Sequence, residues 1–212
     1  MKLIDLTHAV YTGMPSIPSD KHVTTEIKEI SNINNDGIER HQILMSCHSG
    51  THIDSPIHMV KDGITLDKIP LEYLIGKSKK IKLKKEENEA IDLNEIKDYD
   101  LNNLDFLIFQ TSWEKRCNKK DYYFNHPYIS QEAITYLAST KLKGLLIDTP
   151  NPDKFDDHNY PIHKIWFASK SVLVENVCNL DMLGNDIYNL IIAPLNLNAE
   201  AAPARIFIFP AP

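Results

Sequence analysis

Short apolar runs typical of β-strands constrain the fold of this chain more than any other sequence feature. They are rich in valine, isoleucine, leucine and phenylalanine, and they lie at residues 23–27, 43–45, 81–83, 104–109, 144–147, 172–174, 190–192 and 206–209. Helical signals are fewer. Residues 130–138 begin at Ser130, a favourable N-cap, and a second helix is expected over residues 161–168. The sequence therefore predicts an α/β fold with a mixed sheet.

The length of 212 residues fits one domain spanning residues 1–212. Hydrophobic residues make up 42% and charged residues 25%, which is typical of globular proteins and argues against disordered, collagen-like and coiled-coil classes. The lysine-rich segment 77–89 is expected to be a solvated strand and turn without a binding role. No internal repeat or linker marks a further boundary.

The charge balance points to a small-molecule substrate. A net charge of -6 argues against nucleic acid or an anionic membrane surface as partner, since both attract clustered positive charge. Asp5 and His8 interrupt the apolar stretch that a signal peptide needs, and no apolar run is long enough to span a membrane. Three widely spaced cysteines without a CxxC pair are expected to be reduced thiols. We therefore expect a cytoplasmic protein.

Three of the nine histidines fall within one eleven-residue segment, which also carries an aspartate: His48, His52, Asp54 and His58. Gly50 and Pro56 argue against a continuous helix here, so an extended piece that enters and leaves a turn is expected. On an extended chain His52 and Asp54, two positions apart, point the same way. The spacing favours a metal site over isolated polar residues in a loop.

Imidazole nitrogens together with a carboxylate suit zinc, manganese or iron(II), whereas calcium and magnesium prefer oxygen ligands alone. A divalent ion held by these residues would activate water at neutral pH. The chain would then need no serine or cysteine nucleophile.

The segment from His48 to His58 resembles the HxGTHxDxPxH signature of the cyclase family, which includes bacterial kynurenine formamidases and isatin hydrolases. Further similarities extend the resemblance over nearly the whole chain: Asp5-Leu6-Thr7-His8, Gly13-Met14-Pro15, Thr111-Ser112-Trp113, Asp148-Thr149-Pro150 and Ala201-Ala202-Pro203-Ala204-Arg205. Only the long signature is specific. The resemblance implies a swivelling β/β/α fold and a homo-oligomer, either a dimer or a tetramer.

The resemblance also implies a one- or two-metal centre of divalent zinc or manganese, and we expect two ions per subunit. His48, His52 and Asp54 would bind the first ion. A later histidine and a glutamate twelve residues further on complete such centres, and His163 with Glu175 has this spacing. His158 is the alternative histidine, but the same spacing from it leads to Lys170.

By similarity to the family, His58 is the general acid/base, which accepts a proton from the activated water and delivers one to the leaving nitrogen. The alternative roles for His58 are a third metal ligand or a hydrogen-bonding partner of a ligand.

Kynurenine formamidases resemble one another in a Pro-x-Trp-Pro stretch, where this chain has Pro15-Ser16-Ile17-Pro18. Ile17 is expected to contact the substrate without aromatic stacking. We therefore expect a metal-dependent hydrolase of linear formamides or cyclic amides, with aryl formamides such as N-formylkynurenine as the leading class. The alternatives are a lactone, cyclic-ester or isatin-type ring hydrolase, and a catalytically silent binding protein that would not need His58, His163 and Glu175.

Overall fold

Seven strands close into a barrel in the computed structural model, which describes residues 3–18, 23–119 and 121–211. Each strand of the ring pairs with the next: β12 (Ala201–Pro210), β11 (Ile187–Pro194), β5 (Ile75–Lys82), β7 (Phe106–Gln110), β9 (Gly144–Ile147), β10 (Val172–Glu175) and β4 (His52–Asp54). A pairing between β4 and β12 closes the ring, and β1 (Ile4–Asp5) adds to β12 beside it. Closure satisfies backbone groups that an open sheet would leave at its edges.

The barrel combines two strand directions. β5, β7, β9 and β10 run parallel, whereas β4, β11 and β12 pair antiparallel with their neighbours. The α/β class with a mixed sheet is therefore confirmed, and with it the swivelling β/β/α arrangement. The carboxyl ends of the parallel strands meet at one rim of the barrel, where open α/β sheets also place their ligands.

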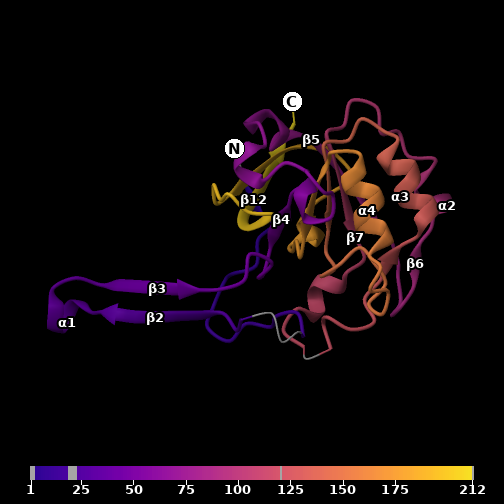
Figure 1. Cartoon of the computed structure of the whole chain (residues 1–212). Helices are drawn as coiled ribbons and strands as arrows, with labels where there is room; N and C mark the ends of the chain where they lie inside the picture. The colour runs from indigo at the N-terminus through magenta and orange to yellow at the C-terminus, as the bar shows by residue number, and fades with distance from the viewer. Residues whose placement is uncertain (1–2, 19–22, 120, 212) are drawn as a thin grey trace.

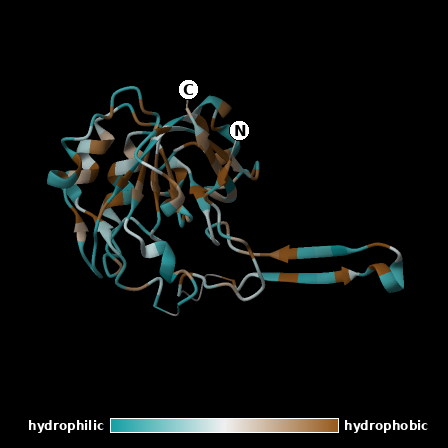
Figure 2. Ribbon diagram, turned by 180° about the vertical axis from the view of Figure 1, so that it is seen from behind, coloured by the Kyte–Doolittle hydropathy of each residue, from teal (hydrophilic) through white to brown (hydrophobic). Residues whose placement is uncertain are grey.

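Alternation along the parallel strands separates two cores. On β7, Phe106 and Ile108 face the barrel interior, while Leu107 and Phe109 face a layer of helices. That layer consists of α2 (Leu93–Ile96), α3 (Gln131–Ala138) and α4 (Pro161–Ala168), which cover the outer side of these strands (Figure 1). Hydrophobic residues gather along the strands that lie between the two cores (Figure 2).

Both predicted helices are confirmed. The Ser130 hydroxyl accepts a hydrogen bond from the backbone N–H of Ala133 and caps α3. Short 3₁₀ helices supply further turns, at Pro56–His58, Leu66–Lys68, Leu71–Tyr73, Trp113–Arg116 and Leu180–Met182. No helix among the described residues is long and apolar enough to cross a membrane.

The predicted runs from residue 81 onward all overlap barrel strands. The lysine-rich segment contains the strand that was expected of it, but the expectation that this strand is solvated was wrong at Lys80. Its first half belongs to β5, a strand with neighbours on both sides. Lys80 is only 7% exposed, and its ammonium group donates to the carbonyl oxygens of Leu180 and Leu183. These hydrogen bonds satisfy a buried charge that the sequence pattern alone suggested was solvated.

Two further pairs of strands lie outside the barrel. β6 (Ala90–Ile91) and β8 (Tyr128–Ile129) form a short parallel pair. β2 (Glu26–Ser31) and β3 (Arg40–Leu44) form a hairpin with α1 (Ile33–Asp36) at its tip, and this hairpin projects far from the body (Figure 1). The predicted runs at 23–27 and 43–45 overlap these two strands, although β2 begins and β3 ends at different residues.

Candidate metal centre

Strand β4 sets the geometry of the site. His52 and Asp54 project from the same face of β4, while Ile53 between them is fully buried in the barrel core. The His52 Nε2 atom lies 3.5 Å from Asp54 Oδ1. Before the strand, Gly50 adopts a φ of 63°, a conformation that glycine reaches without strain and that turns the chain into β4.

Strand pairing brings Glu175 to the same place. Glu175 is the last residue of β10 and stands directly opposite His52 in the antiparallel β10–β4 ladder. Opposite residues in a ladder have neighbouring side chains, and Glu175 Oε2 lies 3.4 Å from His52 Nε2. The other carboxylate oxygen of Glu175, Oε1, lies 3.4 Å from His163 Nε2 on helix α4.

The remaining two predicted residues complete the cluster. His48 Nδ1 lies 3.1 Å from Asp54 Oδ1, and the ring of His58 lies 4.6 Å from the ring of His48, centroid to centroid. Two overlapping triads could each hold an ion, and they share Asp54: His48, Asp54, His58 and His52, Asp54, Glu175. The structure thus brings together all six predicted residues: His48, His52, Asp54, His58, His163 and Glu175. His58, predicted as the general acid/base, also belongs to one of the two triads that could hold an ion.

The buried polar atoms of this cluster fit a cation. His52 Nε2, both carboxylate oxygens of Asp54 and Oε1 of Glu175 are buried, and none of them forms a hydrogen bond. Buried polar groups without partners are costly, and atoms of this kind are the ones that bind zinc or manganese. The donor set therefore fits a divalent ion.

The charges agree with this interpretation. Burial alone would lower the pKa of His52, but Asp54 and Glu175 outweigh it and raise that pKa to about 9. Burial likewise opposes the ionised form of Asp54, yet His52 and His48 hold the pKa of Asp54 well below its usual range. The two buried carboxylates therefore stabilise positive charge at the centre of the cluster.

Hydrogen bonds behind the ligands fix which ring nitrogen faces the centre. His52 Nδ1 donates to the Gly50 carbonyl at 2.9 Å, and His163 Nδ1 donates to Asp153 Oδ2 at 2.6 Å, so both rings present Nε2. His48 has the opposite arrangement, because its Nε2 lies 3.2 Å from Glu200 Oε1 and its Nδ1 faces Asp54. Such partners orient metal ligands in many proteins.

Sequence reasoning missed Asp153 and Glu200. Asp153 lies in a loop after Pro152 with no spacing pattern that links it to His163. Glu200 directly precedes the Ala201-Ala202-Pro203 segment, so its position next to a matched motif was the available signal. Neither His158 nor His163 forms part of the two candidate triads, but His163 Nε2 lies 3.4 Å from Glu175 Oε1.

Ile17 packs on a small cluster of Trp113, Tyr122 and Tyr123, which contains none of the candidate metal ligands. A hollow of about 190 Å³ beside this cluster is lined by Tyr11, Met14, Tyr122, Tyr123 and others. Gly50, which holds His52, and Asn176, which follows Glu175, form its inner wall. Tyr122 and Tyr123 thus line a hollow whose wall also includes Asn176, one residue after Glu175, and Gly50, two residues before His52.

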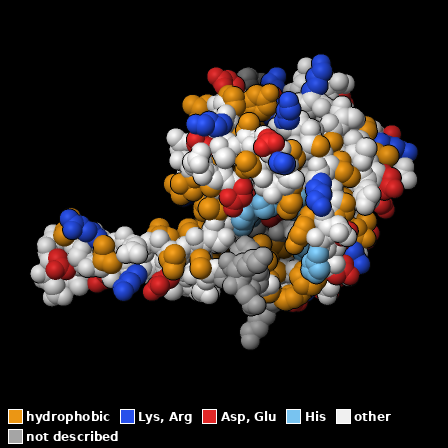
Figure 3. Space-filling view, in the orientation of Figure 1, with side chains coloured by type: hydrophobic (Ala, Val, Ile, Leu, Met, Phe, Trp, Pro, Cys, Tyr) orange, Lys and Arg blue, Asp and Glu red, His pale blue; other side chains and the backbone are white. Residues whose placement is uncertain are grey.

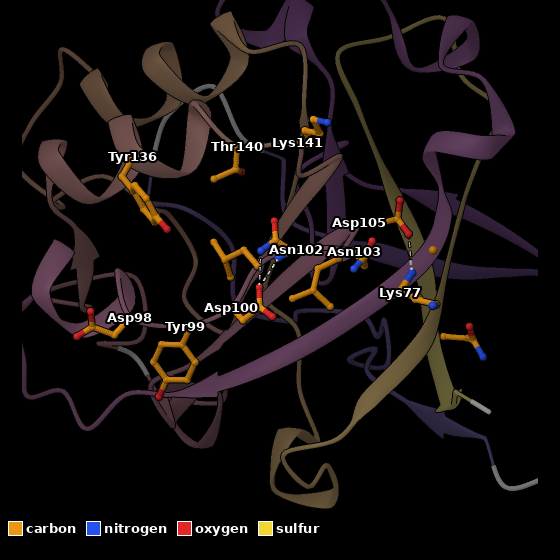
Figure 4. Close-up of a pocket in the computed structure, with 14 residues that line it drawn as sticks. Lys77, Asp98, Tyr99, Asp100, Asn102, Asn103, Asp105, Tyr136, Thr140 and Lys141 are labelled. Atoms are coloured by element: carbon orange, nitrogen blue, oxygen red, sulfur yellow. Dashed lines mark hydrogen bonds between the residues drawn. The ribbon is translucent and has the colours of Figure 1, made fainter.

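A second hollow, of about 900 Å³, lies at the opposite end of the parallel strands (Figure 4). Lys77, Asp100, Asp105 and Lys141 are among the residues that line it, and Asp105 accepts the backbone N–H of Lys77 there. None of the six clustered residues takes part in it. This end of the barrel is therefore separate from the metal centre.

Comparison with known proteins places this geometry in context. The family described as "Putative cyclase" matches residues 4–154. A kynurenine formamidase of Bacillus anthracis is 27% identical over 213 residues, covering 99% of this chain and 98% of that protein.

Two solved structures resemble this chain over nearly its whole length. A protein from Bacillus stearothermophilus described as a "predicted metal-dependent hydrolase" is 30% identical, with a TM-score of 0.82 over 98% of this chain and 97% of that one. Isatin hydrolase A from Labrenzia aggregata, bound to benzyl benzoate, is 26% identical, with a TM-score of 0.88 over 100% of this chain and 94% of that one.

Proposed function

The chain belongs to the cyclase family, and we propose that it is a metal-dependent hydrolase that cleaves linear formamides or cyclic amides with an activated water. The observation that carries this proposal is the convergence of four imidazoles and two buried carboxylates, four of whose polar atoms have no hydrogen-bonding partner. The relatives named kynurenine formamidase and isatin hydrolase support the same reaction class, hydrolysis of a C–N bond outside peptides.

We assign two ions, zinc or manganese, to this cluster. His48, His52 and Asp54 would hold the first, and His163 with Glu175 would complete the second. Two carboxylates near the two ions offset the repulsion between them. When bound, such ions lower the pKa of water and polarise a carbonyl oxygen.

His58 is the proposed general acid/base. Burial lowers the pKa of its imidazole, so the ring is neutral near pH 7 and can accept a proton. It stands beside His48 and His163, with ring centroids 4.6 and 5.6 Å away, and thus faces the place where a substrate carbonyl would bind. After accepting a proton from water, His58 can deliver one to the leaving nitrogen as the C–N bond breaks.

The substrate class follows from the hollow beside the ligands. Its volume of about 190 Å³ is below the range of about 300–1,000 Å³ that holds drug-sized ligands. Tyr122 and Tyr123 offer aromatic faces, and Ile17 packs on the same cluster. A compact aryl amide fits this space better than a long-chain substrate. The contact of Ile17 with the substrate stays a prediction, because Ile17 packs on Trp113, Tyr122 and Tyr123 and is not among the residues that line the hollow.

Opening of an isatin-type cyclic amide is the second candidate, and lactones or other cyclic esters belong with it. The small hollow favours a ring whose amide and aromatic parts are fused, because a fused ring needs no room for an extended side chain. The proposed assignment holds both ions without His58, so the presence of His58 beside the cluster favours an enzyme over a catalytically silent binding protein.

The test combines elemental analysis of the purified protein with hydrolysis assays on an N-formyl aryl amide, isatin and a lactone. We expect about two equivalents of zinc or manganese per chain and activity on one of the amides. A metal-loaded protein that hydrolyses none of the three substrates contradicts the proposal. A protein that hydrolyses only the lactone assigns the chain to ester chemistry.

Three expectations stay predictions. Cytoplasmic location is supported by the three free thiols, which suit a reducing compartment. The homodimeric state rests on the family resemblance. The assignment of residues 1–212 to a single catalytic domain rests on the closed barrel, which uses strands from both halves of the chain.

A further inference from the structure

Asn176 lies at a junction between the segments that carry the candidate ligands. It directly follows Glu175, the last residue of β10, and its backbone adopts the left-handed conformation with a φ of 58°. Its backbone N–H donates to the Thr149 carbonyl at 3.2 Å, and its backbone carbonyl accepts the Thr51 hydroxyl at 2.6 Å. The residue is only 3% exposed, so little water competes for these hydrogen bonds.

The side-chain amide of Asn176 can have only one orientation. One end lies 3.0 Å from the carbonyl oxygen of Gly50, and the other lies 2.7 Å from the hydroxyl of Tyr122. A carbonyl oxygen can only accept, so the Nδ2 amide nitrogen must face Gly50, and Oδ1 must then accept the hydroxyl of Tyr122. The reversed amide would place two acceptors against each other. Tyr122, which is 2% exposed, therefore holds the amide in this orientation.

The Gly50 carbonyl accepts two hydrogen bonds, one from the Asn176 amide and one from His52 Nδ1 at 2.9 Å. Both of its lone pairs are therefore used. Gly50 has a φ of 63°, a conformation that glycine leaves as readily as it adopts. Without the Asn176 amide, the peptide group after Gly50 could rotate, and the His52 ring would lose the acceptor that fixes its tautomer. The amide removes this freedom.

These hydrogen bonds run from the wall of the aromatic hollow to a buried ligand. Tyr122, Asn176 and Gly50 all line the hollow. His52, at the other end, is fully buried, and histidine covers only small patches of the face seen in the space-filling view although the chain has nine histidines (Figure 3). Hydrogen bonds shielded from water are electrostatically stronger than exposed ones. The buried amide is therefore well placed to control the His52 ring.

We propose that Asn176 is a positioning residue, which fixes the His52 ring at the metal centre through the Gly50 carbonyl while Tyr122 orients its amide. This inference rests on the proposed metal centre, in which His52 binds the first ion. Loss of the direct partner of a ligand typically weakens metal binding 10- to 100-fold. Asn176 acts on that partner rather than on the ring, so loss of its amide should have an effect near the lower limit, about 10-fold.

The test loads the full chain with cobalt(II) and measures its affinity in competition with a chelator. Cobalt(II) accepts nitrogen and oxygen ligands as zinc does, and its visible absorption reports their geometry. Asn176→Gly removes the amide and keeps a residue that adopts a positive φ without strain. This variant should bind cobalt about 10-fold more weakly and have a changed visible spectrum.

Asn103→Gly is the matched control. Asn103 has a φ of 60° and lines the hollow at the opposite end of the barrel. This variant should therefore keep the cobalt affinity and the spectrum of the wild type.

Tyr122→Phe tests the other end of the hydrogen-bonded chain, because it keeps the ring and removes only the hydroxyl. It should shift the cobalt affinity and spectrum in the same direction as Asn176→Gly, but less. The double variant Asn176→Gly/Tyr122→Phe should bind cobalt as weakly as Asn176→Gly alone, since the hydroxyl acts through the amide. Additive losses in the double variant would contradict this order.

Cobalt affinity and spectrum equal to those of the wild type in Asn176→Gly overturn the positioning role. A loss of stability in denaturant with an unchanged spectrum overturns it as well, because a purely structural residue would give that result. If Asn176→Gly does not fold, Tyr122→Phe decides, and unchanged cobalt binding in that variant overturns the proposal. A wild-type chain that binds no cobalt refutes the metal centre itself, and the inference fails with it.

Discussion

The Asp153 carboxylate both accepts a hydrogen bond from the first turn of helix α4 and orients His163 on that helix. One carboxylate oxygen accepts the backbone N–H of Ile162 at 2.7 Å, and the other accepts Nδ1–H of His163 at 2.6 Å. Asp153 is fully buried, and burial would by itself lower the pKa of His163, but Asp153 and Glu175 raise it to about 10. Helix start and ligand orientation thus depend on one side chain.

Asp153→Asn should weaken metal binding about 10- to 100-fold, because an amide no longer fixes the His163 tautomer as a carboxylate does. Metal titration of the purified variant measures this effect. Ser130→Ala is the matched control, since it removes the cap of α3 and should lower the free energy of unfolding by about 1 kcal/mol while metal affinity stays unchanged. Equal metal affinity in Asp153→Asn and the wild type would refute the orienting role.

Glu175→Gln should reduce the bound metal from two equivalents toward one and remove most activity, since the amide keeps the shape but not the charge that holds a second ion. Elemental analysis and turnover measure the two effects. Glu86→Gln is the control, because Glu86 is an exposed glutamate outside the cluster and its loss should keep both ions. Full metal content with full turnover in Glu175→Gln would refute the two-ion assignment.

His58→Ala should keep nearly all of the bound metal while turnover falls about 10²- to 10⁴-fold, as expected for loss of a general acid/base. Its proximity to His48 and Asp54 makes the metal measurement decisive. Loss of an ion from this variant would show that His58 is a ligand instead.

Ile17→Trp should improve kcat/KM for N-formylkynurenine about 2- to 12-fold, since an aromatic contact contributes about 0.5–1.5 kcal/mol. The wild-type chain should process that substrate poorly compared with smaller amides. Ile17→Leu serves as a control that keeps the apolar contact and adds no ring. Efficient wild-type turnover of N-formylkynurenine with a low KM would contradict this account of Ile17.

The sequence predicted β7, β9 and β10 because their residues are buried on both faces and read as continuous apolar runs. In β11 and β12 buried positions alternate with more exposed ones, and only their most apolar stretches were predicted. It predicted a strand in the lysine-rich segment but misjudged its exposure, because Lys80 reaches carbonyl groups far away in sequence that no local pattern displays. The sequence also did not predict that β2 and β3 form a hairpin projecting from the body, because Ile30 and Ile43 have the same strand preference as residues inside the barrel. Local preference predicts a strand but not its neighbours.

The candidate site was predictable where its residues lie close in sequence or keep a fixed spacing. His48 to His58 form one segment, and the interval between His163 and Glu175 matches the resemblance. Asp153 could not be found, because its contact with His163 depends on how a loop returns to the start of a helix. Residues that orient ligands need geometry rather than composition, and sequence spacing carries little of it.

β12 closes the barrel by pairing with β4, and it is the last strand to be synthesised. β4, which carries His52 and Asp54, pairs with β10 on one side and with residues 201–203 of β12 on the other. A growing chain therefore exposes its metal-binding segment along one edge until the ribosome has made β12. A nascent chain stalled before residue 201 should bind metal poorly and depend on chaperones, whereas release of β12 should complete barrel and metal centre in one step.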